Sequence, residues 1–425
     1  MYLLSHGTQG LRAGRSGLMQ GMTATRRIRR APGTWVSLLG LLSALGACAP
    51  RHEVALPSVP PPPLLTAAQV AGLIPSTVKD REGWAADVLA ALEAEALPPS
   101  PPAICSVLAI IEQESGFQAD PAVPGLAKLV RQRLETEAGR LGPLGKRLLA
   151  EVLAARAPGQ TRTFDARLST LRTERDLDRL FRDMLAYGEQ TYPKTFAAAD
   201  LASSLLRAQK LEDLNPITTA GAMQVSVQYA QEKAGEDADP VAVRESLYTR
   251  AGGVRYGTAR LLGFEAAYPE PVFRFADYNA GIYASRNAAL QSQVSQLTGL
   301  SLAADGDLQL YDKQGEPRSE DSQSLRALLV FRQRFAPDLS ERQVRRDVRT
   351  EKTLDLEATD TWRAVKRAAA RRTGETPAYA QLPEVTLKSP KLRTERTTAW
   401  FARSVDTRYQ KCLARYHARE RAGPP

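Results

Sequence analysis

The 425-residue sequence has few of the side chains on which many enzymes depend. It holds three histidines and three cysteines, and aromatic residues make up 6% of the chain. His6 and His52 lie near the amino end, so only His417 could belong to a folded body. This excludes a Ser-His-Asp triad and a multi-histidine metal site. Any catalytic groups must therefore be carboxylates or hydroxyls, and we expect no metal and no cofactor.

Acidic residues are absent from residues 1–48, but the same segment contains six arginines: Arg12, Arg15, Arg26, Arg27, Arg29 and Arg30. The apolar stretch 35–42 that follows is far shorter than the ~20 residues that span a bilayer. A basic segment, a short apolar segment and small residues are typical of a secretory signal. We therefore expect residues 1–48 to be a signal peptide, with Met22 as an alternative start.

The end of this segment, Leu45-Gly46-Ala47-Cys48, matches the bacterial lipobox, in which the cysteine is lipidated and becomes the new amino terminus. The alternative is an ordinary signal with an incidental cysteine, but the place of Cys48 directly after the apolar segment favours lipidation. Ala49 follows instead of Asp, which in similar lipoproteins favours the outer membrane. We expect a lipid anchor in the outer membrane and a body that faces the periplasm.

Residues 49–64 contain six prolines, and such a proline-rich tether is extended and semi-rigid. Without the six arginines of the signal segment, 51 of the 57 basic residues remain against 47 acidic ones, a net charge of +4. This small excess suits work against an anionic cell wall and lipid headgroups. It gives no reason to expect nucleic acid as a partner.

Helical patterns dominate the remainder of the chain, so the expected fold class is mostly α. Residues 82–97 place apolar side chains at helical spacing, and the prolines within 98–102 separate this helix from the next. The segment 305–316 predicts a small β-hairpin, because an apolar run lies between turn residues. Further helices are expected at 324–335, 359–372 and 398–420.

The most informative segment is 110–117, where an apolar helix ends in two acidic residues and Ser-Gly. At 100° per residue, Glu112 and Glu114 lie on opposite flanks of the apolar stripe, so periodicity does not choose between them. A buried acid at this place would have a raised pKa and could donate a proton near neutral pH. The alternative for Glu114 is a solvated carboxylate at a helix end.

Two short motifs follow far downstream, Gly221-Ala222-Met223-Gln224 and Tyr278-Asn279-Ala280-Gly281. In this order the three segments resemble the lytic transglycosylases, goose-lysozyme-like enzymes that cut peptidoglycan glycan strands. The resemblance covers about a quarter of the chain and is closest to uncharacterised proteobacterial lipoproteins with a transglycosylase-like core.

The resemblance implies a lysozyme-like helical catalytic domain at 65–300. In this sequence 107 positions separate Glu114 from Gly221, the first residue of the Gly-x-Met-Gln element. The corresponding separation in the family is much shorter. We therefore expect a helical insertion at about 121–212, which could wall or cap a cleft. Residues 301–425 would form a mainly helical extension, with the small hairpin, packed on the core.

The resemblance implies that Glu114, and not Glu112, is the catalytic acid and base. Glu114 would cleave the MurNAc-GlcNAc β-1,4 bond and leave a 1,6-anhydro-MurNAc end. The substrate-binding residues would be Ser115, Gly221, Met223, Gln224, Tyr278 and Asn279. Muramidase hydrolysis is the alternative reaction. A second alternative is a peptidoglycan-binding lipoprotein without turnover, which the insertion and Ala222 motivate.

Each of these residues has an expected role. Gly221 would let the chain approach the sugar, and Met223 and Gln224 would line the floor of the site. Tyr278 would hydrogen-bond Glu114, and Asn279 would hold an N-acetyl group. The alternatives are a core position for Met223 and a helix cap for the Asn-Ala-Gly run.

Cys105 and Cys412 remain after lipidation of Cys48. In an oxidising periplasm they could form a disulfide that fastens the last helix to the helix of Glu114. Two buried thiols are the equal alternative.

Overall fold

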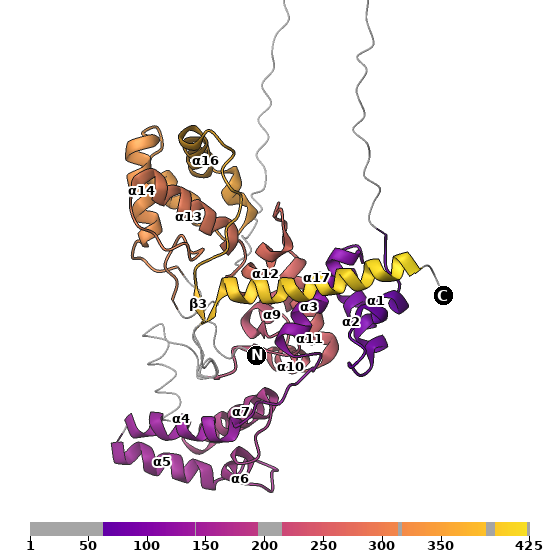
Figure 1. Ribbon diagram of the computed structural model, residues 1–425. Helices are drawn as coiled ribbons and strands as arrows, with labels where there is room; N and C mark the ends of the chain where they lie inside the picture. Colours follow the sequence, from indigo (N-terminus) through magenta and orange to yellow (C-terminus); the bar gives the residue numbers. More distant parts are fainter. Residues whose placement is uncertain (1–62, 141, 194–214, 313–316, 388–395, 423–425) are drawn as a thin grey trace, which may run out of the picture. The chain divides into compact units, whose positions relative to one another are not determined.

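The computed structural model describes residues 63–425 apart from 141, 194–214, 313–316, 388–395 and 423–425 (Figure 1). Over this part of the chain the predicted fold class, mostly α, is confirmed, since helices dominate and strands occur as two-residue pairs. The expected signal segment, Cys48 and most of the tether lie outside the described residues. None of the described helices is long and apolar enough to cross a membrane.

Three helices open the folded body: α1 (Ala67–Leu73), α2 (Arg81–Ala94) and α3 (Pro101–Glu114). Ser100 caps α3 by accepting a hydrogen bond from the Ala103 N–H, and a proline occupies its first turn. At the other end Gly116 and Phe117 have φ angles of +59° and +63°, which a helix cannot contain. Thus α3 ends at Glu114.

The expected insertion is helical in its described part: α4 (Leu126–Arg140), α5 (Gly142–Ala154), α6 (Phe164–Leu168) and α7 (Glu174–Thr191). A capping box fixes the start of α7, because the Thr173 side chain accepts from the Asp176 N–H and Asp176 accepts from the Thr173 N–H.

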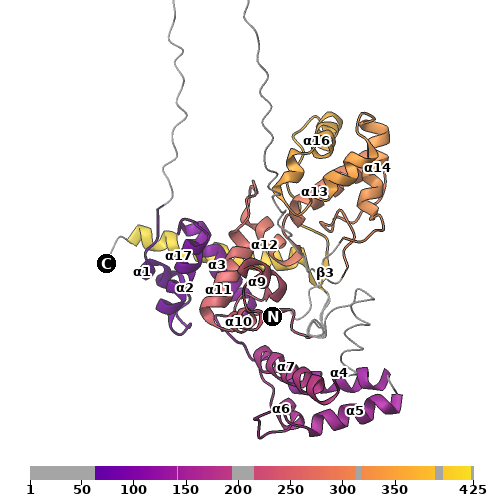
Figure 2. The same ribbon diagram turned by 180° about the vertical axis from the view of Figure 1, so that it is seen from behind.

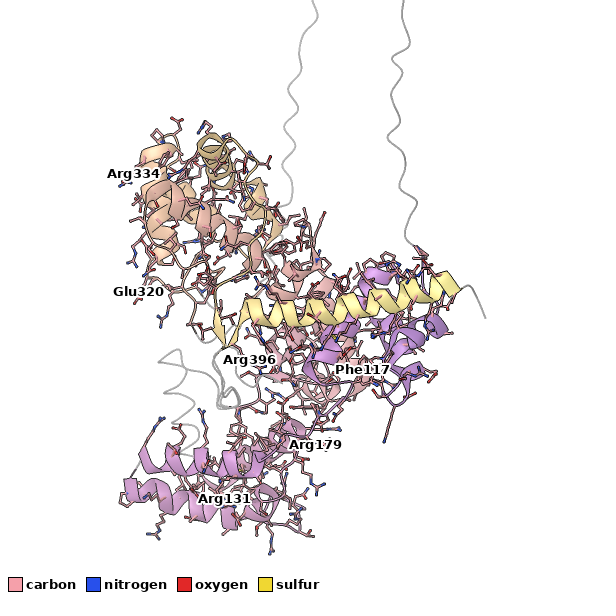
Figure 3. All side chains as sticks on the ribbon, in the orientation of Figure 1. Phe117, Arg131, Arg179, Glu320, Arg334 and Arg396 are labelled. Atoms are coloured by element: carbon pink, nitrogen blue, oxygen red, sulfur yellow. A yellow bond between two sulfur atoms is a disulfide. The ribbon has the colours of Figure 1, made fainter. Side chains whose placement is uncertain are left out.

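Ion pairs fasten α7 to α10 (Pro240–Leu247). Glu245 of α10 binds three arginines spaced along one face of α7, namely Arg175, Arg179 and Arg182; Arg179 is labelled in Figure 3. Hydrogen bonds from Arg179 and then from the other two lower the pKa of Glu245 to about 2. The fully buried Asp178 pairs with Arg244 at 2.8 Å. The position of α7 is therefore fixed by charge pairing as well as by apolar packing.

The next segment contains a two-strand hairpin and four helices. β1 (Thr219–Ala220) pairs antiparallel with β2 (Val225–Ser226), with Ala220 opposite Val225. The helices are α9 (Val227–Ala234), α10, α11 (Arg250–Leu262) and α12 (Pro271–Ala280).

The remaining elements are α13 (Ala284–Thr298), α14 (Gln323–Phe335), α15 (Glu341–Val348), the 3-10 helix η2 (Leu354–Ala358), α16 (Asp360–Thr373), β3 (Thr386–Leu387), β4 (Arg396–Thr397) and α17 (Thr398–Ala422). The three helices expected here are present as α14, α16 and α17. The small strand pair expected in the C-terminal extension is confirmed, as β3 and β4. Within the expected bounds 305–316 and next to them, the described residues show one antiparallel bridge, between Tyr311 and Pro317, and a hydrogen bond from the Arg318 N–H to the Leu310 carbonyl. The N–H groups of Leu308 and Gln309 bind the buried Glu351 carboxylate instead of a strand partner.

Two apolar cores organise these helices. The first contains α1, α2, α3, α11, much of α12, parts of the insertion and α17. The second contains α13, α14, α15 and α16. The cores do not follow the expected boundary at residue 300, because α13 joins the second core and α17 returns to the first.

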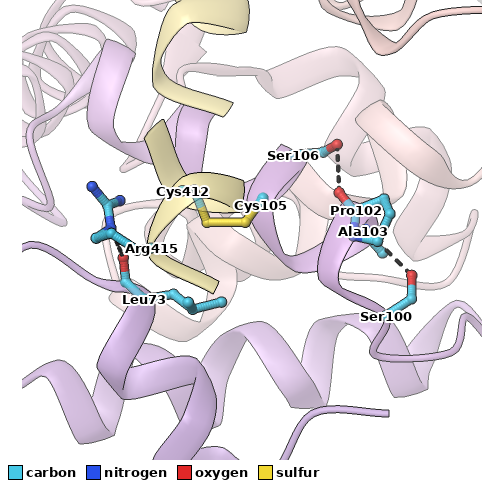
Figure 4. Close-up of a disulfide and its surroundings, with 8 residues drawn as sticks. All are labelled: Leu73, Ser100, Pro102, Ala103, Cys105, Ser106, Cys412 and Arg415. Atoms are coloured by element: carbon cyan, nitrogen blue, oxygen red, sulfur yellow. Dashed lines mark hydrogen bonds between the residues drawn. A yellow bond between two sulfur atoms is a disulfide. The ribbon is translucent and has the colours of Figure 1, made fainter. Parts of the chain in front are cut away.

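The return of α17 covers the helix of Glu114. Figures 1 and 2 show α17 beside α3 and α12, and it packs on both. A disulfide joins Cys105 of α3 to Cys412 of α17, with the Cα atoms 5.5 Å apart (Figure 4). The Ser404 hydroxyl also donates to the Gln113 side chain at 3.0 Å. The last helix therefore completes the surroundings of α3.

Candidate functional site

Glu114 is the buried acid of the site, with a side chain only 5% exposed. Burial raises its pKa to about 7, the Glu174 carboxylate adds to the rise, and Arg408 opposes it. At neutral pH a large fraction of this carboxyl therefore carries a proton. This is the state that a general acid requires.

Glu112, the other acid of α3, lies in a different environment. Its side chain is about one-third exposed, at 32%, and its carboxylate lies 3.9 Å from the Arg408 guanidinium of α17. The Glu112 carboxylate therefore touches solvent and lies near a guanidinium group. The tertiary structure thus buries Glu114 and leaves Glu112 partly exposed, a difference that helical periodicity left open.

Glu174 is a second buried acid that the sequence reasoning missed. It is the first residue of α7 and is 1% exposed. The Gln224 amide donates to its Oε2 at 3.0 Å, and its charge acts on Glu114. A signal existed in the sequence, since the capping pattern Thr173-x-x-Asp176 places Glu174 in a first helical turn. Nothing in that pattern says that the charge of Glu174 acts on Glu114.

The charge of Glu114 affects the pKa of Tyr278 in α12. The predicted hydrogen bond from the Tyr278 hydroxyl to Glu114 is nevertheless wrong. Its hydroxyl donates to the Met223 carbonyl at 2.8 Å, and a hydroxyl has one proton to give. Burial raises the pKa of Tyr278 well above its usual range, and the Glu114 charge raises it further. The Tyr278 hydroxyl thus gives its proton to the Met223 carbonyl and not to Glu114.

Gly221 has a packing role and not the expected role of admitting a sugar. Its φ of +79° favours glycine, and a Cβ there would collide with the backbone carbonyl of Leu247. Met223 is fully buried and packs against Gly257 of α11, so the expected contact with a pyranose is also wrong. The hairpin of β1 and β2 sits so close to α10 and α11 that Gly221 has no room for a side chain and Met223 has no exposed surface.

We expect Gly221→Ala to destabilise the protein by at least about 1–2 kcal/mol, the cost of a left-handed conformation for a residue with a Cβ, plus the cost of the collision. The measurement is urea unfolding. Gly125→Ala is the matched control, since Gly125 has a similar φ of +72° and open space around its Cβ position. Equal losses in the two variants would show that the close approach to Leu247 is unimportant.

Gln224 was expected to offer its amide to sugar hydroxyls, and the structure corrects this. Its side chain is 8% exposed and donates to Glu174 and to the Gly221 carbonyl. Its carbonyl oxygen accepts from the Thr219 hydroxyl at 3.1 Å. The amide is occupied on both sides, so Gln224 connects the hairpin to α7.

Ser115 and Asn279 also hold structure. The Ser115 hydroxyl donates to the Ile111 carbonyl and accepts from the Gln118 N–H, which caps the end of α3. The Asn279 carbonyl oxygen accepts from the Thr398 hydroxyl at 3.0 Å and so holds the start of α17. The expected substrate role of Ser115 is therefore wrong, whereas the Asn279 side chain stays partly exposed.

Asp277, next to Tyr278, is a further buried acid that the sequence reasoning missed. Burial raises its pKa to about 6, and hydrogen bonds from Tyr268 and Ser285 oppose the rise. It accepts from the N–H groups of Tyr283 and Ser285 at 3.0 and 2.6 Å. These bonds fix the turn from α12 into α13, so Asp277 holds the junction of the two cores.

The site thus consists of two buried carboxyl groups, Glu114 and Glu174, and the partly buried Tyr278 within a mostly helical protein. The family model described as "Protein of unknown function (DUF1615)" matches residues 77–415. The "Uncharacterized protein YaiW" of Escherichia coli (strain K12) is 36% identical over 343 residues, which cover 80% of this chain and 87% of that protein. No solved structure matches the chain. The chain belongs to the DUF1615 family.

Proposed function

We propose that this protein is a lytic transglycosylase that cleaves the MurNAc-GlcNAc β-1,4 bond of peptidoglycan, with Glu114 as its single acid and base. The observation that carries the proposal is the burial of Glu114 at the end of α3, with a pKa near 7. Such a group can protonate a leaving oxygen and then remove a proton, both near neutral pH. The resemblance of the three sequence motifs supplies the substrate class.

In this proposal the protonated Glu114 donates to the glycosidic oxygen as the bond to MurNAc breaks. The N-acetyl group of that sugar assists the departure. The ionised Glu114 then takes the proton of the sugar's 6-hydroxyl, and a 1,6-anhydro ring closes. One carboxyl group therefore serves both steps, and no metal or cofactor takes part.

A second candidate is a peptidoglycan-binding lipoprotein without turnover. One observation favours it: three side chains that were predicted to bind sugar instead contact other parts of the protein. Ser115 and Gln224 form hydrogen bonds within the fold, and Met223 is buried. Digestion of purified sacculi separates the candidates. Anhydro-muropeptides support the transglycosylase, new reducing ends indicate hydrolysis, and binding without products supports the second candidate.

We also propose that the mature protein is held in the outer membrane by lipid on Cys48, which lies outside the described residues. Cys48→Ser should move the protein from the membrane fraction to the soluble periplasmic fraction, because a lipid chain adds about 0.8 kcal/mol of membrane affinity per buried CH₂. Fractionation and mass measurement check this. An unmodified Cys48 in soluble mature protein would contradict the anchor, and unchanged thermal unfolding of Cys48→Ser is the control for folding.

A further inference from the structure

An exposed tryptophan lies at the start of α17, the helix that packs on α3. Trp400 is 37% exposed, whereas Trp84 and Trp362, the other tryptophans among the described residues, are 4% and 7% exposed. An indole has a large apolar surface, so an exposed one lacks the stabilisation that burial gives. Binding sites use such rings, because a rigid indole offers a flat apolar face and a polar N–H group. Trp400 is therefore a candidate for contact with a ligand.

The Trp400 ring is held in place on two sides. The Arg396 guanidinium lies over the indole, 4.0 Å from the ring centroid. Arg396, labelled in Figure 3, belongs to β4 and is paired with Leu387 of β3. The Thr397 hydroxyl accepts from the Trp400 backbone N–H at 3.1 Å, which caps the first turn of α17. A ring and a cation fixed in this way lose little conformational freedom when a ligand binds.

Positive charge surrounds this ring. Arg403, an exposed residue, follows Trp400 by three positions on α17, and residues three apart are neighbours on a helix surface. Together with Arg396 it places basic groups beside a flat apolar ring. This combination is complementary to a ligand that has both apolar C–H faces and carboxylates. Peptidoglycan has both, in its pyranose rings and in the carboxylates of its stem peptides and free lactyl groups.

Contacts of the same helix place Trp400 beside the candidate site. Ser404 follows it by one turn, about 6 Å along the helix axis, and donates to the side chain just before Glu114. Two positions before Trp400, the Thr398 hydroxyl donates to Asn279 at 3.0 Å. Asn279 is the partly exposed residue that was predicted to hold an N-acetyl group. The ring therefore lies between contacts to two of the three motif segments.

We propose that Trp400 and Arg396 form a platform that binds the peptidoglycan glycan strand: the indole stacks on a pyranose ring, and the guanidinium group binds a carboxylate. The platform serves the proposed function, on which it rests, because the same strand would reach Glu114. Three of the side chains predicted to bind sugar form contacts inside the protein, so the strand needs exposed contacts elsewhere. The start of α17 supplies them.

The test is a binding titration with glycan strands from which an amidase has removed the stem peptides. The reference protein carries Cys48→Ser, so that it is soluble, and Glu114→Gln, so that the strand stays intact. We expect Trp400→Ala to weaken the affinity measured by calorimetry by about fivefold, the size expected for loss of a stacked ring. An unchanged affinity would overturn the proposal.

Tryptophan fluorescence gives a second readout that needs no change at Trp400. Because Trp84 and Trp362 are buried, acrylamide in solution quenches mainly Trp400. Saturating glycan strands should shield this emission from acrylamide. Unchanged quenching would overturn the proposal, and this measurement decides the outcome if Trp400→Ala does not fold.

The guanidinium group has its own test. Arg396→Gln should weaken binding of these strands, whose lactyl groups are carboxylates, by about fivefold. It should leave the binding of a neutral N-acetylglucosamine hexasaccharide unchanged, whereas Trp400→Ala should weaken the binding of both ligands. An equal loss for both ligands in Arg396→Gln would overturn the assignment of a carboxylate to Arg396.

Phe335→Ala is the matched control, because Phe335 of α14 is an aromatic residue that is 40% exposed and belongs to the second core. It should bind the strands as the reference does, and an equal loss there would overturn the proposal. A lipid surface is the other partner that an indole with arginines can meet. Shielding of Trp400 by vesicles of phosphatidylglycerol and phosphatidylcholine, but not by the strands, would also overturn it.

The platform and the proposed function fail in different ways. Sacculi left uncut by protein with an intact Glu114 would refute the transglycosylase, but binding that depends on Trp400 would still support the platform. Cleavage of sacculi by Trp400→Ala with an unchanged kcat/KM would refute the platform and leave the transglycosylase in place.

Discussion

Glu114→Gln should reduce the release of 1,6-anhydro-muropeptides from purified sacculi by at least about 100-fold, the lower end of what general acid catalysis contributes. Glutamine keeps the shape of the side chain but has no acidic proton. High-performance chromatography and mass spectrometry of the soluble products measure the loss. Activity that survives this substitution would remove Glu114 from the mechanism.

The pH dependence has a defined sign. The pKa of Glu114 is raised to about 7, so its acid form predominates below pH 7 and disappears above it. The rate should therefore fall as the pH rises through about 7. The raised pKa also affects stability. The stabilising contribution of the protonated Glu114 is fully present at a pH below the pKa of this residue in the unfolded chain, and it is lost as the pH rises through its pKa in the folded protein.

Stability provides the control for folding. Because Glu114→Gln removes a carboxyl whose ionisation is unfavourable in the folded protein, its unfolding temperature at pH 8 should match or exceed that of the parent. Glu112→Gln is the matched variant on the exposed flank, and it should keep full activity. Loss of activity in Glu112→Gln would point to the other acid of α3.

Removal of the disulfide should have the second large effect. Cys105 and Cys412 are 307 positions apart, and a crosslink over so long a loop stabilises the folded state by up to about 5 kcal/mol in the chain-entropy model. The double variant Cys105→Ala, Cys412→Ala should therefore lose about 2–5 kcal/mol in urea unfolding. Because α17 covers α3, we also expect a loss of activity at temperatures where the parent is active.

The control for this experiment is the covalent state itself. In Cys48→Ser protein exported to the periplasm, thiol counting under denaturing, non-reducing conditions should find no free thiol. Two free thiols would rule out the bond in the cell. Urea unfolding of the reduced parent should reproduce the loss of stability of the double variant, and the difference between the two measures the effect of the missing sulfur atoms.

Local patterns predicted a large part of the helical structure, because helix periodicity and caps act over a few residues. The end of α3 at Glu114 followed from Ser115-Gly116, and the helices expected at 324–335, 359–372 and 398–420 are present as α14, α16 and α17. The expected bounds of the hairpin at 305–316 were less accurate for a non-local reason. Glu351, about 40 positions away, accepts from the N–H groups of Leu308 and Gln309, which therefore do not join a strand ladder.

The candidate site shows the same division. The sequence brought attention to Glu114, Tyr278 and the motif at 221–224, and these residues do come together. It could not assign their contacts, since the direction of the Tyr278 hydroxyl and the two partners of Gln224 depend on packing between distant helices. Motif residues expected to touch a sugar instead hold the hairpin against α10 and α11.

What the sequence by itself determined is therefore the mostly helical class, the apolar helix that ends in acidic residues, and the segments that meet around it. Only the tertiary structure decided which acid is buried. Arg408 and solvent satisfy Glu112, whereas Glu114 lies in the first core and has its pKa raised. The tertiary structure also brought Glu174 to the site. Burial and the field of a distant charge are properties of the packed chain, and a local pattern does not contain them.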